Sequence, residues 1–107
     1  RSTMDPSQLT TTFKALSDPN RLKILVSLRP GSLCACQILE NLHISQSTLS
    51  HHMQVLLGAD LVVSWQVGKW THYRLNPVGM SAINQFLSNL QAAETPAPSP
   101  SANCYCA

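Results

Sequence analysis

The four cysteines of this 107-residue chain form two pairs of identical spacing, Cys34-Ala35-Cys36 and Cys104-Tyr105-Cys106. Thiolates prefer soft or thiophilic centres to hard cations. Three sulfurs suit a pyramidal trivalent arsenic or antimony centre, whereas four sulfurs suit tetrahedral zinc or cadmium. The two pairs therefore predict a thiolate site for a metal or metalloid, with Cys34, Cys36, Cys104 and Cys106 as the candidate ligands.

Thiols at this spacing also allow a redox interpretation, in which two of the cysteines oxidise to each other and the protein senses oxidants or persulfides. Catalysis is not expected, because no C-x-x-C lies in a βαβ pattern and no cysteine has an evident base. No secretory signal and no apolar window of about 18 residues are visible. We therefore expect a cytoplasmic protein with reduced thiols and no membrane span.

Length and composition predict one small domain, since about 100–200 residues is usual for a domain. Hydrophobic residues make up 44% of the chain, charged residues 11%, and the net charge is +2. This weakly basic balance permits nucleic-acid binding without requiring it. We set aside residues 1–4, because Arg1-Ser2-Thr3 ahead of Met4 is interpreted as an appended remnant. Residues 5–92 form the predicted domain, and residues 93–107 form a flexible proline-rich tail that carries the second C-x-C pair.

Apolar periodicity predicts helices that must position the thiols. The first covers about 7–17, and Asp18-Pro19 is a strong start for the second. In that second helix, Leu22, Leu25 and Leu28 are predicted to share the buried face. A third helix has its buried stripe starting at Ala35, so the first cysteine pair lies at its beginning. Residues i and i+2 of a regular helix point about 200° apart, so the two thiols can converge only if the chain there is extended or the first turn opens.

The next helix, at about 46–57, has the pattern of a DNA-reading helix. Ser45 is its expected N-cap, and Gly58 lies near its C-terminal end, where a cap is favoured. If its apolar residues face the core, short polar side chains point outward and can approach base edges and phosphates. The candidate DNA contacts on this helix are Gln46, Ser47, Thr48, Ser50 and His51.

A β-hairpin is predicted after this helix, with strands at 61–67 and 70–75 and a final helix from Pro77 to about Ala92. Gly68-Lys69 favours a type II′ turn, and Lys69 at its tip is a candidate phosphate contact. Trp65, Trp70 and Tyr73 are expected in the hairpin core, and His43 and His72 are expected to be structural or surface residues. The fold class is mainly α with a small β-hairpin, a winged helix-turn-helix.

Three segments in this order resemble the ArsR/SmtB family of bacterial repressors: ALSDPNRLKIL at 15–25, SQSTLSHHM at 45–53, and the wing at 67–75. The resemblance covers roughly residues 8–92. It implies a homodimer paired through the first and last helices, with operator DNA as its partner. It also implies repression of a resistance operon that is relieved by an inducer.

Cys34-Ala35-Cys36 resembles the arsenic-repressor branch of that family, in which a C-x-C-x-x-C run binds trivalent arsenic or antimony. Here Leu39 occupies the third cysteine position, so such a site lacks one sulfur. Cys104 or Cys106 is the natural replacement, because the intervening residues 93–103 can span up to about 36 Å. The expected inducer is arsenic(III) or antimony(III), with no organic cofactor. A cadmium, lead or zinc sensor, the redox sensor above, and a DNA-binding module without an inducer are the alternatives.

Overall fold

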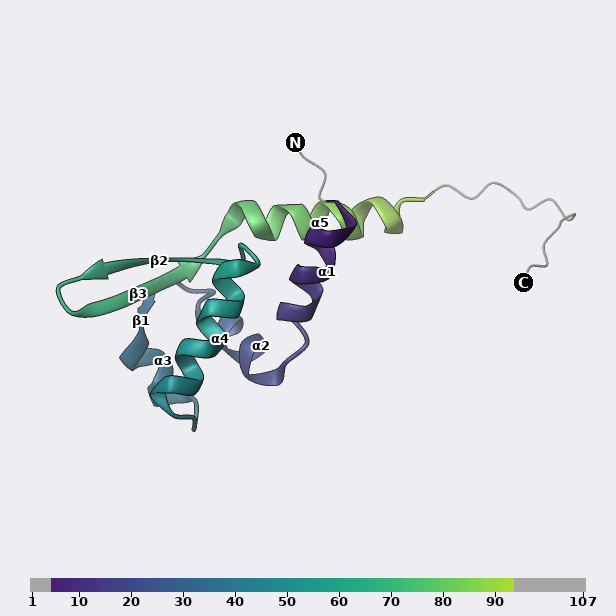
Figure 1. Cartoon of the computed structure of the whole chain (residues 1–107). Helices are drawn as coiled ribbons and strands as arrows, with labels where there is room; N and C mark the ends of the chain where they lie inside the picture. Colours follow the sequence, from purple (N-terminus) through teal and green to yellow (C-terminus); the bar gives the residue numbers. More distant parts are fainter. Residues whose placement is uncertain (1–4, 94–107) are drawn as a thin grey trace, which may run out of the picture.

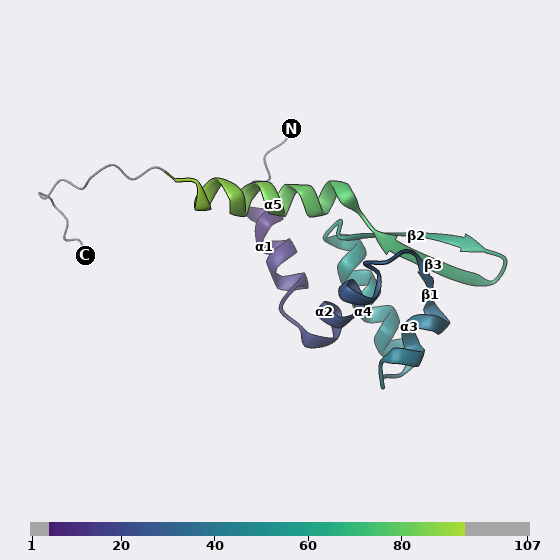
Figure 2. The same cartoon turned by 180° about the vertical axis from the view of Figure 1, so that it is seen from behind.

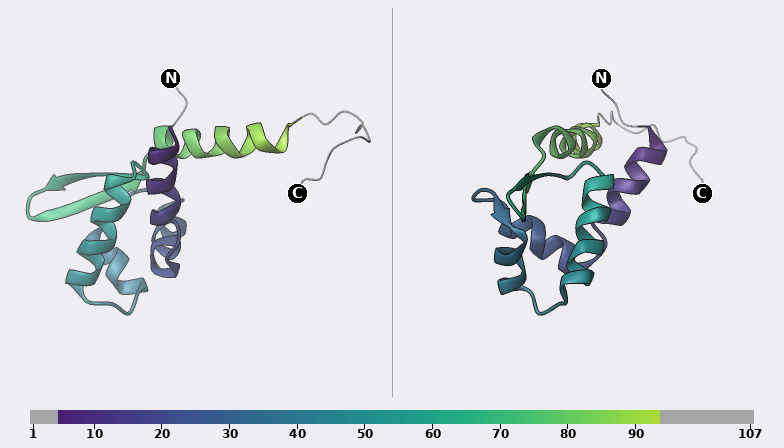
Figure 3. Two further views of the ribbon diagram at one scale, coloured as in Figure 1. Left: turned by 45° about the vertical axis from the view of Figure 1, so that its right-hand side comes forward. Right: turned by 60° about the vertical axis from the view of Figure 1, so that its left-hand side comes forward.

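The computed structural model describes residues 5–93, which form five helices and three strands. Along the chain these are α1 (Pro6–Ala15), α2 (Pro19–Ser27), β1 (Leu33–Cys34), α3 (Ala35–Asn41), α4 (Gln46–Gly58), β2 (Val62–Val67), β3 (Trp70–Leu75) and α5 (Pro77–Gln91). The β2–β3 hairpin projects from one side of the helical body, and α5 crosses its top above α1 (Figures 1 and 2). The α3–α4 turn lies at the opposite end from α5 (Figure 3). The predicted winged helix-turn-helix is confirmed.

The predicted helix starts are also confirmed, and each has a physical cause. The Asp18 carboxylate accepts hydrogen bonds from the backbone N–H groups of Asn20 at 2.8 Å and Arg21 at 3.3 Å. Ser45 caps α4 by accepting from the backbone N–H of Thr48 at 3.1 Å. These side-chain oxygens accept hydrogen bonds from N–H groups of the first helical turn, which have no carbonyl partner within the helix. No helix in the described part of the chain is long and apolar enough to cross a membrane.

The core forms where α2, α3, α4 and the start of β2 meet. Its largest fully buried apolar side chains are Ile24, Leu28, Ile38, Leu49, Met53, Leu56, Leu61 and Val62. The prediction that Leu22 shares the buried face of α2 is wrong, because its side chain is 47% exposed. Ile24 is buried with Leu25 and Leu28 instead. The inward face of α2 is thus rotated away from Leu22, and Leu22 and Val26 form an apolar stripe on the surface.

The sheet has one strand more than the sequence predicted. Its order is β1-β3-β2, with both pairs antiparallel. β1 contains only Leu33 and Cys34, which pair with Tyr73 and His72 of β3. A two-residue strand has no detectable alternation, so its pairing partner is set by the tertiary fold. This pairing joins Cys34 to the β2–β3 hairpin.

The hairpin turn follows the predicted chemistry. Val67 pairs with Trp70, which leaves Gly68 and Lys69 as a two-residue loop. Gly68 has φ of +62°, whereas Lys69 does not have a positive φ. A positive φ at the first central residue alone is the pattern of the type II′ turn, in which glycine is favoured there.

The end of α4, which packs against the start of α5, differs from the prediction that a C-terminal cap is favoured near Gly58. The residue with left-handed backbone is Asp60, with φ of +61°, while Gly58 is the last residue of α4. The backbone of Gly79 in α5 packs directly against the carbonyl of Asp60, where a Cβ on residue 79 would collide. Asn76 also donates its backbone N–H to the Leu61 carbonyl at 2.9 Å. These contacts fix the start of α5 against the end of α4.

Candidate nucleic-acid interface and thiol site

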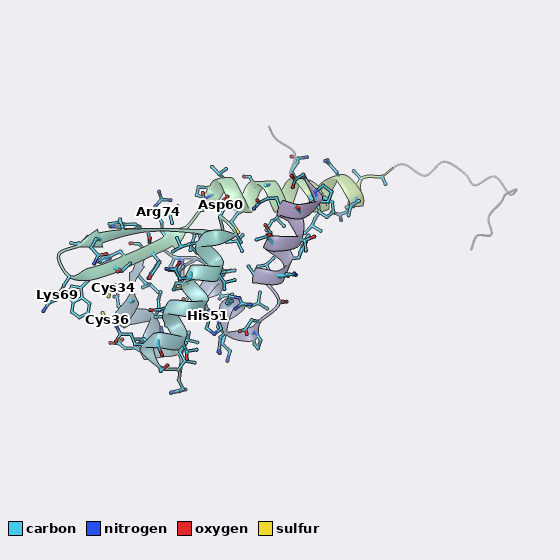
Figure 4. The ribbon with its side chains drawn as sticks, in the orientation of Figure 1. Cys34, Cys36, His51, Asp60, Lys69 and Arg74 are labelled. Carbon is cyan, nitrogen blue, oxygen red and sulfur yellow. The ribbon has the colours of Figure 1, made fainter. Side chains whose placement is uncertain are left out.

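The outer face of α4 presents a row of short polar side chains to solvent. All five predicted DNA-reading residues are exposed, namely Gln46, Ser47, Thr48, Ser50 and His51. The Ser45 hydroxyl lies 3.2 Å from the Ser47 hydroxyl and donates to the Thr48 hydroxyl at 2.9 Å. This network orders the first turn of α4, where backbone N–H groups and the helix dipole also favour a phosphate. Figure 4 shows His51 on α4, well away from the wing tip.

The inner face of α4 is held by packing and by one buried polar contact. Leu49, Met53 and Leu56 are buried in the core, and His52 is only 7% exposed. The Arg21 Nη1 atom lies 3.0 Å from His52 Nδ1. His52 therefore packs at the core side of α4 and forms its side-chain hydrogen bond within the protein. Its partner on α2, 31 residues earlier in the chain, was not foreseen.

Lys69 is exposed at the tip of the β2–β3 hairpin, called here the wing (Figure 4). Tyr73 is buried as predicted, but Trp65 is 38% and Trp70 51% exposed, so the prediction that both lie in the hairpin core is wrong. Among the described residues, the outer end of this hairpin extends beyond the helices (Figure 1), so its two indole rings stay partly in solvent. The wing therefore exposes both the ammonium of Lys69 and these two aromatic rings to solvent.

Cys34 and Cys36 meet because only one of them belongs to the helix. Cys34 is the N-cap of α3, with extended backbone at φ −85° and ψ 162°, and Cys36 lies in the first turn. Of the two ways in which the thiols could converge, the structure shows the extended chain. The N–H of Cys34 donates to Gln37 Oε1 at 2.8 Å, and the backbone N–H of Gln37 points back at the Cys34 sulfur. Cys34 is buried and Cys36 exposed, and neither forms a disulfide. Figure 4 labels both residues at the start of α3.

The two thiols are chemically unequal. A hydrogen bond from the Cys36 thiol lowers the pKa of Cys34, and the Gln37 N–H lowers it further, outweighing burial. The same pairing raises the pKa of Cys36, since its proton is held by the Cys34 sulfur. The thiolate is the form that binds metals and attacks electrophiles. Cys34 is therefore the first thiolate of the pair, with Cys36 as its proton-bearing neighbour.

Cys104 and Cys106 lie outside the described residues. Within residues 5–93, no three histidine, cysteine, aspartate or glutamate side chains gather as a possible metal site. The described part of the chain thus brings together two of the four predicted sulfur ligands. His43 is exposed as expected. His72 is half-buried in β3, where it pairs with Cys34 of β1, which agrees with the structural role expected for it.

Comparison with known proteins identifies the family of this chain. Residues 18–64 match the family model described as "Bacterial regulatory protein, arsR family". The chain is 43% identical over 91 residues to the arsenical resistance operon repressor of Staphylococcus xylosus, covering 85% of this chain and 88% of that protein. The chain belongs to the ArsR family. The resemblance drawn from its three sequence segments is thereby confirmed.

Solved structures of other members share the fold of this ArsR-family protein. An ArsR-like transcriptional regulator from Rhodococcus sp. RHA1 is 28% identical, with a TM-score of 0.71 over 80% of this chain and 81% of that one. A homodimeric winged helix-turn-helix DNA-binding domain from Mycobacterium bovis, described as a possible ArsR-family regulator, is 26% identical. Its TM-score is 0.65, over 79% of this chain and 82% of that one. The protein is therefore a regulator with a DNA-binding fold.

Proposed function

We propose that this protein is a homodimeric transcriptional repressor released from its operator by thiolate capture of trivalent arsenic or antimony. The observation that carries the proposal is the geometry of Cys34, whose extended backbone at the N-cap of α3 brings its thiol to that of Cys36. The pair lies at the start of the helix that leads into α4. The name of the Staphylococcus xylosus relative supports an arsenic-linked role.

An apolar surface on α1 and α5 supports the dimer. Phe13 of α1 and Phe86 of α5 meet edge to face, with ring centroids 6.1 Å apart. Beside them Leu87 is 49% and Leu90 59% exposed. A contiguous apolar patch of this kind in a small domain favours a subunit interface. The homodimeric relative from Mycobacterium bovis shows that this fold can pair.

Two copies of α4 related by a twofold axis would read a pseudo-palindromic operator. Its half-sites would lie about one helical turn apart, or a multiple of that. Gln46, Ser47, Thr48, Ser50 and His51 are the proposed base and phosphate contacts, and Lys69 of each wing is the proposed contact to flanking phosphates. The net charge of +2 is small, so these local contacts carry binding more than the overall charge does.

Inducer capture is a ligand exchange without oxidation or reduction. Arsenous acid carries three hydroxyl groups; each As–S bond that forms replaces one As–O bond, and the thiol proton leaves with the hydroxyl as water. Cys34 and Cys36 supply two sulfurs, and we assign the third to Cys104 or Cys106, because Leu39 occupies the third position of the arsenic-type run. A tethered thiol acts at high effective concentration when its linker can reach.

Titration of the full chain tests this proposal. Wild type and the variants Cys34→Ser, Cys36→Ser, Cys104→Ser and Cys106→Ser are titrated with arsenite, antimonite, cadmium and zinc. Sulfur-ligand absorption reports capture, and fluorescence anisotropy at fixed salt reports operator binding. Cys34→Ser and Cys36→Ser should keep operator affinity and lose release. If both variants are released at wild-type inducer concentrations, the assignment of Cys34 and Cys36 as inducer ligands is wrong. If only cadmium or zinc causes release of the wild type, the inducer is a divalent metal ion and not arsenic or antimony.

The hydrogen-bonded thiol pair also favours a second candidate, a redox-sensing repressor. The low pKa of Cys34 makes it the more reactive thiol toward an oxidant. A peroxide would oxidise the Cys34 thiolate to a sulfenic acid, and the attacking thiol of a second cysteine would expel water to form a disulfide. Mass spectrometry after peroxide treatment, paired with operator binding, separates the candidates: disulfide-dependent release without arsenite response favours the redox sensor.

A further inference from the structure

Cys34, His72 and Trp65 lie in one row across the three-stranded sheet. Cys34 of β1 is paired with His72 of β3, and His72 is paired with Trp65 of β2. Directly opposed residues of antiparallel strands carry their side chains on the same face, with Cβ atoms about 4.5–5.5 Å apart. The thiolate with the lowered pKa therefore has an imidazole of the wing as its cross-strand neighbour.

The second contact in this row is a ring stack. The imidazole of His72 and the indole of Trp65 have centroids 5.8 Å apart and planes 20° apart. His72 is half-buried, whereas Trp65 is 38% exposed. The imidazole is thus held between the indole on one strand and the cysteine position on the other.

Cys34 also belongs to two elements at once. It is the last residue of β1 and the N-cap of α3, so no linker separates the strand paired with the wing from the first turn of the helix. A centre bound by both sulfurs must set the position of Cys34 relative to Cys36. Because Cys34 is part of the backbone ladder with β3, that adjustment is shared with the wing strand. The alternative path, from α3 to α4, runs through the separate turn at 42–45.

We propose that His72 is a positioning residue that couples the thiol pair to the wing. Inducer capture at Cys34 shifts His72, alters its stack with Trp65, and moves the wing tip that carries Lys69 relative to α4. Wing and recognition helix then no longer fit one operator half-site together. This inference rests on the proposed function, because it concerns how capture of the inducer is transmitted to DNA.

The experiment uses the full chain with Trp70→Phe, which leaves Trp65 as the sole tryptophan. Arsenite is the probe, and three signals are recorded: As–S absorption, Trp65 fluorescence and operator anisotropy. In this parent, arsenite should change Trp65 emission in step with capture. In His72→Thr, which replaces the imidazole by a small β-branched side chain that strands favour, As–S absorption should persist while the emission change is lost. The factor by which arsenite lowers operator affinity should be at least about fivefold smaller in His72→Thr than in the parent. Fivefold is the lower end of the coupling usually found between two sites.

His43→Thr is the matched control, because it removes an exposed histidine from the turn between α3 and α4. It should retain all three responses. If His72→Thr unfolds by circular dichroism, Trp65→Leu removes the stack from the other strand and should give the same loss of release with capture intact. Full release in the variant that folds overturns the coupling and assigns transmission to the α3–α4 path. Absence of arsenite capture or release in the parent overturns both the coupling and the proposed function.

Discussion

The guanidinium of Arg21 on α2 and the imidazole of His52 on α4 meet at 3.0 Å, between Nη1 and Nδ1. The same guanidinium donates to the backbone carbonyls of Ala15 at 2.7 Å and Lys14 at 3.4 Å, at the end of α1. A guanidinium only donates hydrogen bonds, so His52 Nδ1 is the acceptor. The side chain of Arg21 therefore links the end of α1 and the middle of α4 to α2.

Removing the hydrogen bonds of Arg21 should destabilise the domain. Arg21→Ala leaves the nearly buried His52 and the Ala15 carbonyl without their partner, at a cost of about 1–3 kcal/mol in the free energy of unfolding. Chemical denaturation followed by circular dichroism measures the change. Lys23→Ala, on the exposed side of the same helix, is the control and should stay near wild type. Equal stability of the two variants would show that the Arg21 contacts contribute nothing.

The outer face of α4 should decide operator affinity. Ser47→Ala and His51→Ala each remove an exposed hydrogen-bonding group without touching the core, so the fold should be retained. A specific base contact contributes about 1–3 kcal/mol, and we expect operator affinity to fall roughly fivefold or more. Anisotropy titration at fixed salt measures it. Ser32→Ala, an exposed serine before β1, is the control, and unchanged affinity in both α4 variants would rule out this helix as the reader.

Charge on the α5 surface should separate the subunits. Leu87→Lys places an ammonium among Phe86 and Leu90, where dimerisation would bury it, so the dimer dissociation constant should rise about tenfold or more. Sedimentation equilibrium measures this constant. Val26→Lys is the matched control, because Val26 is 66% exposed on the separate apolar stripe of α2. If Val26→Lys weakens the dimer and Leu87→Lys does not, the interface lies on α2.

Replacement by alanine should lower the stability of the fold at Gly79 but not at Gly58. Gly79→Ala drives a methyl group into the Asp60 carbonyl and forces α5 to move, which should cost about 1–3 kcal/mol of stability. Gly58→Ala meets no atom within 4 Å at the end of α4 and should be neutral or stabilise the fold by up to about 1 kcal/mol. Thermal unfolding of both variants makes the comparison. A Gly79→Ala protein as stable as Gly58→Ala would show that the α4–α5 junction adapts freely.

The pKa of Cys34 should depend on its neighbour. In a chain with Cys104→Ser and Cys106→Ser, thiolate absorption against pH should show one group that titrates below the ordinary cysteine value. Cys36→Ala in that background removes the hydrogen bond that contributes most to the shift, so the pKa of Cys34 should rise. Thiolate-dependent alkylation at neutral pH should slow accordingly. If the pKa of Cys34 is the same with and without Cys36, the cause lies in the Gln37 N–H instead.

The sequence by itself determined the local elements and their chemistry. Asp18-Pro19 and Ser45 start helices because their side chains satisfy N–H groups of the first turn. Gly68 sets the hairpin turn because glycine accepts a positive φ there. Apolar spacing similarly identified the inner and outer faces of α4. These are properties of a residue and its near neighbours, so spacing is enough to predict them.

Only the tertiary structure decided which distant residues meet. The two-residue strand β1 is too short to carry a pattern, yet its pairing with β3 joins Cys34 to His72. The Arg21–His52 contact links residues 31 positions apart, and the inward rotation of α2 leaves Leu22 exposed. The thiols converge because Cys34 lies before the helix and not within it. Such contacts depend on how elements pack around a shared core, and no local spacing encodes that choice.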